Sequence, residues 1–297
     1  MRRMILILAS ALVMLSSLAC RLSLPRLSEI RLPSFGPRLE VGPMQEFDHE
    51  VQREGTTEAR VKVGLGVGEI TLAAGDPDPL FAGHFRTNVA AWAPEMTWQN
   101  GVLWIEQGES RGIPDPGAEN EWDLRFSPEV EIAMEMEMGV CDGDLDFTGL
   151  SLTRLSLETG ASDLVIRFDA PNPARMDDLT IKAGAASLRV DGIGNAGPGW
   201  VTVEGGVGNT ILDFSGAWPR SARVDITAGV GSLILRVPEN VGVRVEIEGG
   251  LGDVQADAGL TRSDGAYVNS AHGEAETELL ITITVGLGSV ELVSVGE

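Results

Sequence analysis

Residues 201–260 decide the fold of this chain. They hold three similar segments, VTVEGGVGNTILDFSGAW (201–218), VDITAGVGSLILRVPEN (224–240) and VRVEIEGGLGDVQADAGL (243–260). Each segment is a short alternating apolar run, a G-x-G kink, and a second alternating run that ends in a turn. The kink residues Gly208, Gly231 and Gly252 stand 23 and then 21 residues apart. A period in the twenties that is built of strands without helices is typical of a stacked β architecture.

The same pattern extends outward from this stretch in both directions. Small residues at the centre of each segment predict eight kinks, at Gly68, Gly143, Ser162, Ala186, Gly208, Gly231, Gly252 and Gly288. The last kink follows only after 36 residues, and we assign the excess to a loop insertion over 259–278. Small residues are expected at a sharp bend because a β-carbon would crowd it or require an unfavourable backbone angle.

The length of these strands and of their connections selects a fold. Such short runs bury too little surface alone, and the turns between them are too long for hairpins and too short for helical crossovers. Pairing each strand in parallel with the strand one period away solves both problems, and parallel crossovers are right-handed. We therefore predict an all-β protein, a single-stranded right-handed parallel β-helix of about eight rungs with an N-terminal β-hairpin insertion. An antiparallel sandwich is the main alternative. The predicted inward-facing side chains are Val203, Ile226, Leu235, Val245 and Ile247.

Residues 76–128 interrupt the period as an irregular hairpin insertion. LFAGHFRTN predicts a strand, and MTWQNGVLWIEQ predicts a hairpin because Asn100-Gly101 separates two alternating runs. The insertion concentrates four tryptophans, at Trp92, Trp98, Trp104 and Trp122. Clustered tryptophans can form a sugar-binding platform, but we favour the interpretation that they cap one end of the core.

The first residues are predicted to form an export signal. Arg2 and Arg3 precede a short apolar run, and residues 17–20 read Ser-Leu-Ala-Cys, which resembles the lipobox of bacterial lipoproteins. We predict a signal peptide over 1–19, lipid attachment at Cys20, and a proline- and arginine-rich tether over 20–45. The repeat domain then covers 46–297. An ordinary secretory signal and a short uncleaved anchor are the alternatives.

Charge and cysteine content limit the function further. The net charge of −22 argues against nucleic acid and anionic membrane as partners. Only Cys141 remains beside Cys20, so the domain is expected to have no internal disulfide, and Cys141 is expected to behave as a small half-buried residue.

No motif for catalysis or for a cofactor is present. Asp142, Asp144 and Asp146 alternate along one strand, which predicts that they face solvent rather than form a calcium loop. No helix follows any glycine cluster, which excludes a dinucleotide-binding motif. The three histidines lie far apart, without the spacing of metal ligands. We therefore predict no catalytic residues, no metal and no cofactor.

Several stretches resemble the bacterial toast-rack family. They are GHFRTN, the PEMTW…GVLWIEQ segment, NEWDLRFSPEVEIAMEMEMG and the L-x-L-x-x-G-x-S/G repeats, which together cover roughly residues 46–297. This family includes the C-terminal domain of membrane proteins in cell-wall antibiotic responses, and related exported adhesin-like proteins share the repeat. The resemblance implies a right-handed β-helix outside the cytoplasmic membrane, and it implies no activity. The helical membrane spans of the envelope-stress relatives have no counterpart here.

From these observations we expect a non-catalytic, lipid-anchored protein of the cell envelope with an adhesin-like binding surface. Its expected partners are the membrane, through the lipid, and an unknown envelope protein or glycan. Two alternatives remain open. One is a polysaccharide-active β-helix enzyme, with acidic candidates such as Asp191, Asp213 and Asp225. The other is a structural protein that stacks through a terminal rung near Ile283.

Overall fold

The computed structural model describes residues 39–109, 112 and 115–296. From Leu39 onward these residues, apart from Gly112, form one compact unit. Fifteen strands join in a single hydrogen-bonded sheet, so the protein is all-β, as predicted. The helices in the described residues are single turns, η3 (Ala90–Trp92) and α2 (Ile193–Ala196), and none is long and apolar enough to cross a membrane. The predicted signal peptide, Cys20 and most of the tether lie outside the described residues.

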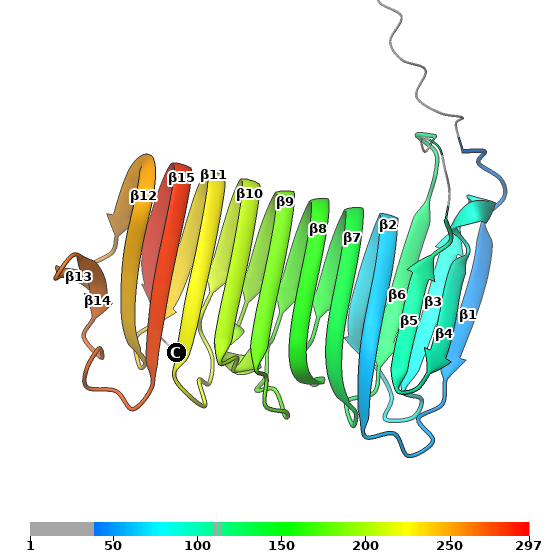
Figure 1. Cartoon of the computed structure of the whole chain (residues 1–297), viewed down its shortest axis with the longest axis horizontal. Helices are drawn as coiled ribbons and strands as arrows, with labels where there is room; N and C mark the ends of the chain where they lie inside the picture. Colours follow the sequence, from blue (N-terminus) through cyan, green and yellow to red (C-terminus); the bar gives the residue numbers. More distant parts are fainter. Residues whose placement is uncertain (1–38, 110–111, 113–114, 297) are drawn as a thin grey trace, which may run out of the picture. The chain divides into compact units, whose positions relative to one another are not determined.

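Eight long strands form the centre of the sheet (Figure 1). In spatial order they are β2 (Glu58–Ala74), β7 (Glu131–Asp146), β8 (Ser151–Arg167), β9 (Asp178–Asp191), β10 (Trp200–Asp213), β11 (Ala222–Pro238), β15 (Glu278–Val295) and β12 (Gly242–Ala256). All seven neighbouring pairs are parallel. This pairing excludes the antiparallel sandwich for the described chain.

Each long strand bends near its middle. Figure 1 shows the strands turning over at the top of the view, so that one half of each strand lies in front of the other. In β11 the buried side chains include Val224 and Ile226 before the bend and Leu233 and Leu235 after it. The inward-facing positions therefore change from even to odd at the bend, and the inward side chains join one hydrophobic core. The five predicted inward residues all pack in or against this core.

The register aligns one position at the bend of every long strand. From β2 to β12 this position holds Gly68, Cys141, Ser162, Ala186, Gly208, Gly231, Gly288 and Gly252. Cys141, not the predicted Gly143, occupies it in β7. Gly143 pairs instead with Ile70 and Leu164 at an inward-facing position. It is a glycine there because Cδ2 of Leu164 lies 2.5 Å from where its β-carbon would stand.

Two short strands share the other edge of β2 and so form a divided layer. β5 (Val102–Gln107) pairs in parallel with the first half of β2, and β6 (Asn120–Phe126) with the second half. Side chains replace the missing backbone between them, since Gln107 Oε1 accepts from the amide of Val67 at 3.1 Å and Asn120 Nδ2 donates to the Val67 carbonyl at 2.8 Å. Hydrogen bonding to β2 therefore continues across the gap between β5 and β6.

Antiparallel strands cover this end of the sheet. β4 (Pro94–Gln99) pairs with β5 across the predicted Asn100-Gly101 turn, whose φ angles are 53° and 75°. β3 (Phe81–Thr87), also predicted, pairs with β6, and β1 (Gln45–Val51) pairs with β3. Trp92 and Trp122 are buried, and the Trp122 ring meets Phe85 edge to face at 5.2 Å. These contacts favour the capping interpretation of the tryptophans over the sugar platform.

The other end differs from the expected chain order. The last strand, β15, inserts between β11 and β12, so Ile283 is paired on both sides, with Ile226 and Ile247. The predicted stacking edge near Ile283 is therefore wrong. The predicted loop insertion also contains a hairpin, β13 (Leu260–Ser263) with β14 (Ala266–Asn269), which pairs with β12 at Arg244 and Val245. Because the segment 259–278 is long, the chain can form the hairpin on the outer side of β12 and then return to place β15 between β11 and β12.

Two adjacent glycines of β10 should respond oppositely to alanine. A β-carbon on Gly206 would lie 2.2 Å from the Gly184 carbonyl oxygen, whereas one on Gly205 would meet nothing closer than Thr210 Oγ1 at 3.6 Å. We expect Gly206→Ala to cost about 2 kcal/mol or more, and Gly205→Ala to stabilise by about 0.4–1 kcal/mol because it restricts the unfolded chain. Thermal unfolding followed by circular dichroism measures both. Equal midpoints for the two variants would contradict the proposed close approach of the strands.

Candidate functional site

The loops that join consecutive long strands gather along one margin of the sheet and enclose a groove of about 1240 Å³. Its walls come from the connections after β8, β9, β10 and β11, from residues 275–277 and from the end of β15. Exposed prolines at positions 171, 173 and 219 line it, together with alanines and glycines. The groove is therefore mainly apolar, and it spans the ends of five neighbouring strands.

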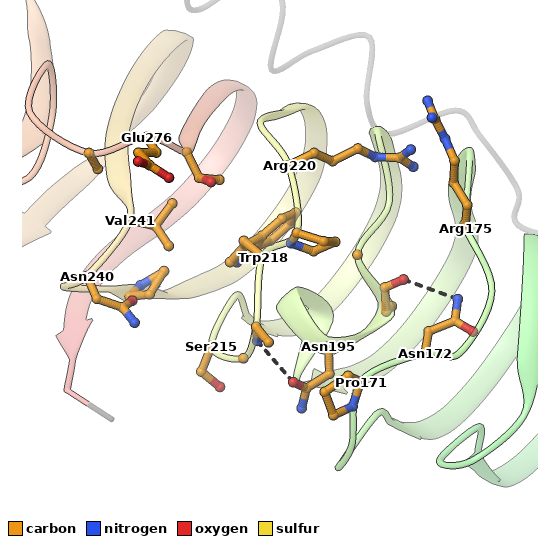
Figure 2. Close-up of a pocket in the computed structure, with 18 of the residues that line it drawn as sticks. Pro171, Asn172, Arg175, Asn195, Ser215, Trp218, Arg220, Asn240, Val241 and Glu276 are labelled. Carbon is orange, nitrogen blue, oxygen red and sulfur yellow. Dashed lines mark hydrogen bonds between the residues drawn. The ribbon is translucent and has the colours of Figure 1, made fainter.

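Trp218 lies near the centre of the groove (Figure 2) and is held by contacts within its own loop. Its side chain is 8 % exposed, its Nε1 donates to the Phe214 carbonyl at 2.8 Å, and its ring stacks on Phe214 with 6.4 Å between centroids. Gly194 makes this placement possible, because a β-carbon there would lie 2.6 Å from Trp218 Nε1. The indole is held by its own loop and is not free to rotate.

Two asparagines tie successive loops together. Asn195 donates from Nδ2 to the Phe168 carbonyl at 2.8 Å and accepts at Oδ1 from the Ala217 amide at 3.0 Å. Asn172 donates from Nδ2 to the carbonyls of Leu152, at 2.8 Å, and Ala196, at 3.3 Å. Figure 2 shows one bond from each asparagine as a dashed line. Asn195 thus joins the loops after β8 and β10, and Asn172 joins the start of β8 to the loop after β9, so the two amide side chains fix the wall of the groove.

Charged groups stand at the two sides of the groove. Arg175 and Arg220 extend to one side of Trp218, and Glu276 lies on the other (Figure 2). Arg220 packs over Gly199 and donates to the Met176 carbonyl, and Arg175 lies 3.6 Å from Asp177. A ligand in the groove would meet apolar walls with cations at one side and a carboxylate at the other.

A second recurring feature runs along the bend. The residue before the aligned kink position is Val67, Val140, Ala161, Ala185, Val207, Val230, Leu287 and Leu251 in successive strands. Val140, Val207, Val230 and Leu287 are each about half exposed. In the strands whose side chain at this position is described, it points outward, because the backbones meet closely on either side of it.

The structure places Asp191 and Asp213 at equivalent positions of the neighbouring strands β9 and β10, one residue past the paired Val190 and Leu212, and it leaves Asp225 apart from them. Asp142 and Asp144 face solvent, as expected, and Asp144 pairs with Arg167. Asp191 bonds to Arg189 at 2.7 Å, and Asp213 accepts from the Ser215 amide at 2.9 Å. Asp225 lies before the bend of its strand, whereas Asp191 and Asp213 lie after it. Within the described ranges, no three His, Cys, Asp or Glu side chains are grouped as a metal site would require.

The histidines and the cysteine have local structural contacts. His84 bonds to Asp48 at 2.7 Å, His272 bonds to Glu278 at 2.7 Å, and His49 meets Phe85 edge to face. Cys141 is buried, and this burial raises the pKa of its thiol above the ordinary value, although a contact with Thr159 opposes the shift. The thiol is therefore protonated and unreactive at neutral pH.

Sequence reasoning missed the residues that build the groove. The signals were present, because a phenylalanine directly follows or ends a strand at Phe126, Phe147, Phe168 and Phe214. The rings of Phe147 and Phe168 stack at 5.5 Å, one layer above the other. Asn172 and Asn195 also stand 23 residues apart, one period of the repeat. A search for repeats within the turns, and not only at the kinks, would have found both.

The fold and groove define a class of protein, a parallel β stack whose turns line a groove. The model of a family described as the N-terminal domain of toast_rack, DUF2154, matches residues 40–191, just over half of the chain. The chain therefore belongs to the toast-rack family, as its sequence suggested.

Solved structures resemble this chain over most of its length. One, provisionally named as a cell adhesion protein, is from Clostridium sporogenes; it is 19% identical, the match covers 85% of this chain and 100% of that chain, and the TM-score is 0.50. Another, provisionally named as an adhesin, is from Bacteroides fragilis, with 13% identity, coverage of 87% and 100%, and a TM-score of 0.37. At such identity the first likeness shows the fold alone. No curated protein matches the sequence.

Removing one asparagine clamp should loosen the groove. Asn195→Ala leaves the Phe168 carbonyl and the Ala217 amide without their partners, so we expect a loss of about 1–3 kcal/mol in unfolding free energy. Asn209→Ala is the matched control, because Asn209 is exposed and its side chain, among the described residues, bonds to Ser232 Oγ alone, at 2.8 Å. It should cost less than about 0.5 kcal/mol. Denaturant titration compares the two. Similar small losses would mean that the clamp is not structural.

Proposed function

We propose that this protein is a non-catalytic, exported component of the cell envelope that binds a partner in its loop-side groove. The observation that carries the proposal is the groove itself, about 1240 Å³ in volume, with a fixed Trp218 and walls that asparagine clamps hold in place. Preformed apolar concavities with a few polar groups are the usual form of a binding site. The partner is an envelope protein or a glycan.

The architecture that supports this function is, we infer, a single-stranded right-handed β-helix in which the eight long strands are the rungs. The parallel pairing of neighbouring long strands supports the coil, and the general preference of parallel crossovers supports its hand. Such a coil places its turns on one margin, so a broad binding face arises there, with residues 275–277 of the loop insertion completing one side. The provisional name of the Clostridium sporogenes structure, a cell adhesion protein, agrees with a binding role.

The hydrogen bonds that Asp191 and Asp213 already make support a binding role over a catalytic one. A retaining or inverting glycosidase needs two carboxyl groups that face each other across a substrate, one of them with a raised pKa. Asp191 is bonded to Arg189 at 2.7 Å, and Asp213 to a backbone amide at 2.9 Å. Neither carboxyl lines the groove.

Membrane attachment through Cys20 remains part of the proposal and has a direct test with an internal control. In a bacterium that processes lipoproteins, the wild-type chain and Cys141→Ala should incorporate labelled palmitate, whereas Cys20→Ala should not. Incorporation is measured, because an uncleaved signal could still hold Cys20→Ala at the membrane. Labelling of Cys20→Ala equal to that of the wild type would refute lipid attachment at this residue.

The groove can be tested by site-specific photocrosslinking in intact cells. Ala217 lines the groove, and Ala258 is an exposed alanine in the turn after β12, outside the groove. A photoreactive side chain at position 217 should give a discrete adduct with one envelope component, and the same side chain at position 258 should not. Ala217→Trp, which fills the groove, should abolish co-purification of that component. No adduct at 217, or identical adducts at both positions, would contradict the proposal.

A further inference from the structure

Four side chains form a row across neighbouring strands on the outer face of the sheet. The register places Trp200 of β10 beside Arg223 of β11, Arg223 beside Leu280 of β15, and Leu280 beside Arg244 of β12. Asp225, Thr282 and Glu246 form the next aligned row, two residues further along the same strands towards the bend. Together the two rows surround a depression of about 240 Å³. This site lies before the bend and has no lining residue in common with the loop-side groove.

The apolar members of the row are unusually exposed. Trp200 and Leu280 are each 42% exposed, and they stand on either side of Arg223. The other exposed large apolar side chains of the described residues are Val41 and the aliphatic row at the bend. The close packing of the bend explains that second row, but it does not explain Trp200 and Leu280. An exposed indole and an exposed leucine beside a cation are typical of a surface that binds something.

Arg223 is available to a ligand. On other strands an arginine pairs with the acid two places along, as Arg189 does with Asp191 at 2.7 Å and Arg244 with Glu246 at 2.8 Å. Arg223 and Asp225 have the same spacing, yet the side chain of neither has a hydrogen bond or ion pair to any residue in the described part of the chain. The depression therefore offers a donor and an acceptor side by side, between two apolar side chains.

This combination matches one ligand chemistry. We propose that the depression binds a neutral acetamido sugar of a glycan, with the ring on Trp200. The acetamido carbonyl accepts from Arg223, its N–H donates to Asp225, and its methyl group contacts Leu280. The chain's net charge of −22 opposes an acidic ligand, and the charges of the four ionised lining residues cancel. An extended peptide could not add as a strand here, because β10, β11 and β15 are already paired on both sides.

Calorimetric titration of the full-length protein with three soluble carbohydrates tests the proposal. Chitotetraose carries acetamido groups, cellotetraose has the same linkage without them, and polygalacturonate is acidic. We expect chitotetraose to bind, with a blue shift of tryptophan fluorescence. Cellotetraose should bind at least about tenfold more weakly, since it lacks the acetamido group and so loses the hydrogen bonds to Arg223 and Asp225. Polygalacturonate should not bind.

Variants locate the binding. Trp200→Ala and Arg223→Ala should each weaken chitotetraose binding at least about tenfold, and both should fold because the two side chains are exposed. Arg60→Ala is the matched control, since Arg60 is also exposed and has no ion pair within the described ranges; it should bind as the wild type does. Unchanged thermal midpoints verify folding.

Several results would overturn the proposal. They are no binding of chitotetraose, equal binding of cellotetraose, preference for polygalacturonate, or full binding by Trp200→Ala or Arg223→Ala. Loss of binding in Ala217→Trp, with Trp200→Ala unaffected, would place the sugar in the loop-side groove instead. Failure here leaves the groove proposal intact, because the two sites share no residue.

Discussion

The close approach of neighbouring backbones at the bend is the constraint on which this structure depends. A β-carbon on Gly231 would lie 1.8 Å from the Gly208 carbonyl oxygen, and one on Gly229 would lie 2.2 Å from that of Gly206. Glycines are therefore required on both sides of the outward residue in these strands, with φ near 144° at Gly208 and Gly231. Cys141, Ser162 and Ala186 occupy the same position without positive φ, so the bend also forms with ordinary backbone angles there.

A fixed bend fixes everything on either side of it. Because each strand meets its neighbour at one defined position, no strand can slip, and every inward side chain lies above its equivalent in the next layer. The long strands therefore end at the same level along the margin where the loops gather. This alignment allows Asn172 and Asn195 to bond to neighbouring loops. The same register places Trp200, Arg223 and Leu280 in one row. Both candidate sites are thus consequences of the alignment at the kinks and not separate additions to the fold.

The sequence predicts the repeating parts of this molecule well and the order of its last strands poorly. Alternation before and after each kink identifies inward residues such as Val203 and Leu235, because a bent strand has one buried side in each half. It cannot tell β12 from β15, since both carry Gly-Leu-Gly at the bend, and local pattern does not encode which strand is the neighbour. At β7 the pattern indicated Gly143, and only the pairing of Cys141 with Gly68 and Ser162 shows that Cys141 is the aligned residue. The groove residues lie in turns, where hydrophobic periodicity gives no signal.

The end of the sheet shows why this stack stops. In the described chain, β12 has a strand on its outer side only at Arg244 and Val245, where β14 pairs with it. An open parallel edge invites another copy to add, yet this edge carries Glu246, Glu248 and Asp253 in a chain of net charge −22. Gly249 and Gly250, with φ of 78° and 83°, also leave the extended conformation there. A second copy that paired with this edge would meet negative charge and a strand whose backbone is not extended at Gly249 and Gly250. Both features oppose pairing, and they argue against self-stacking as the protein's role.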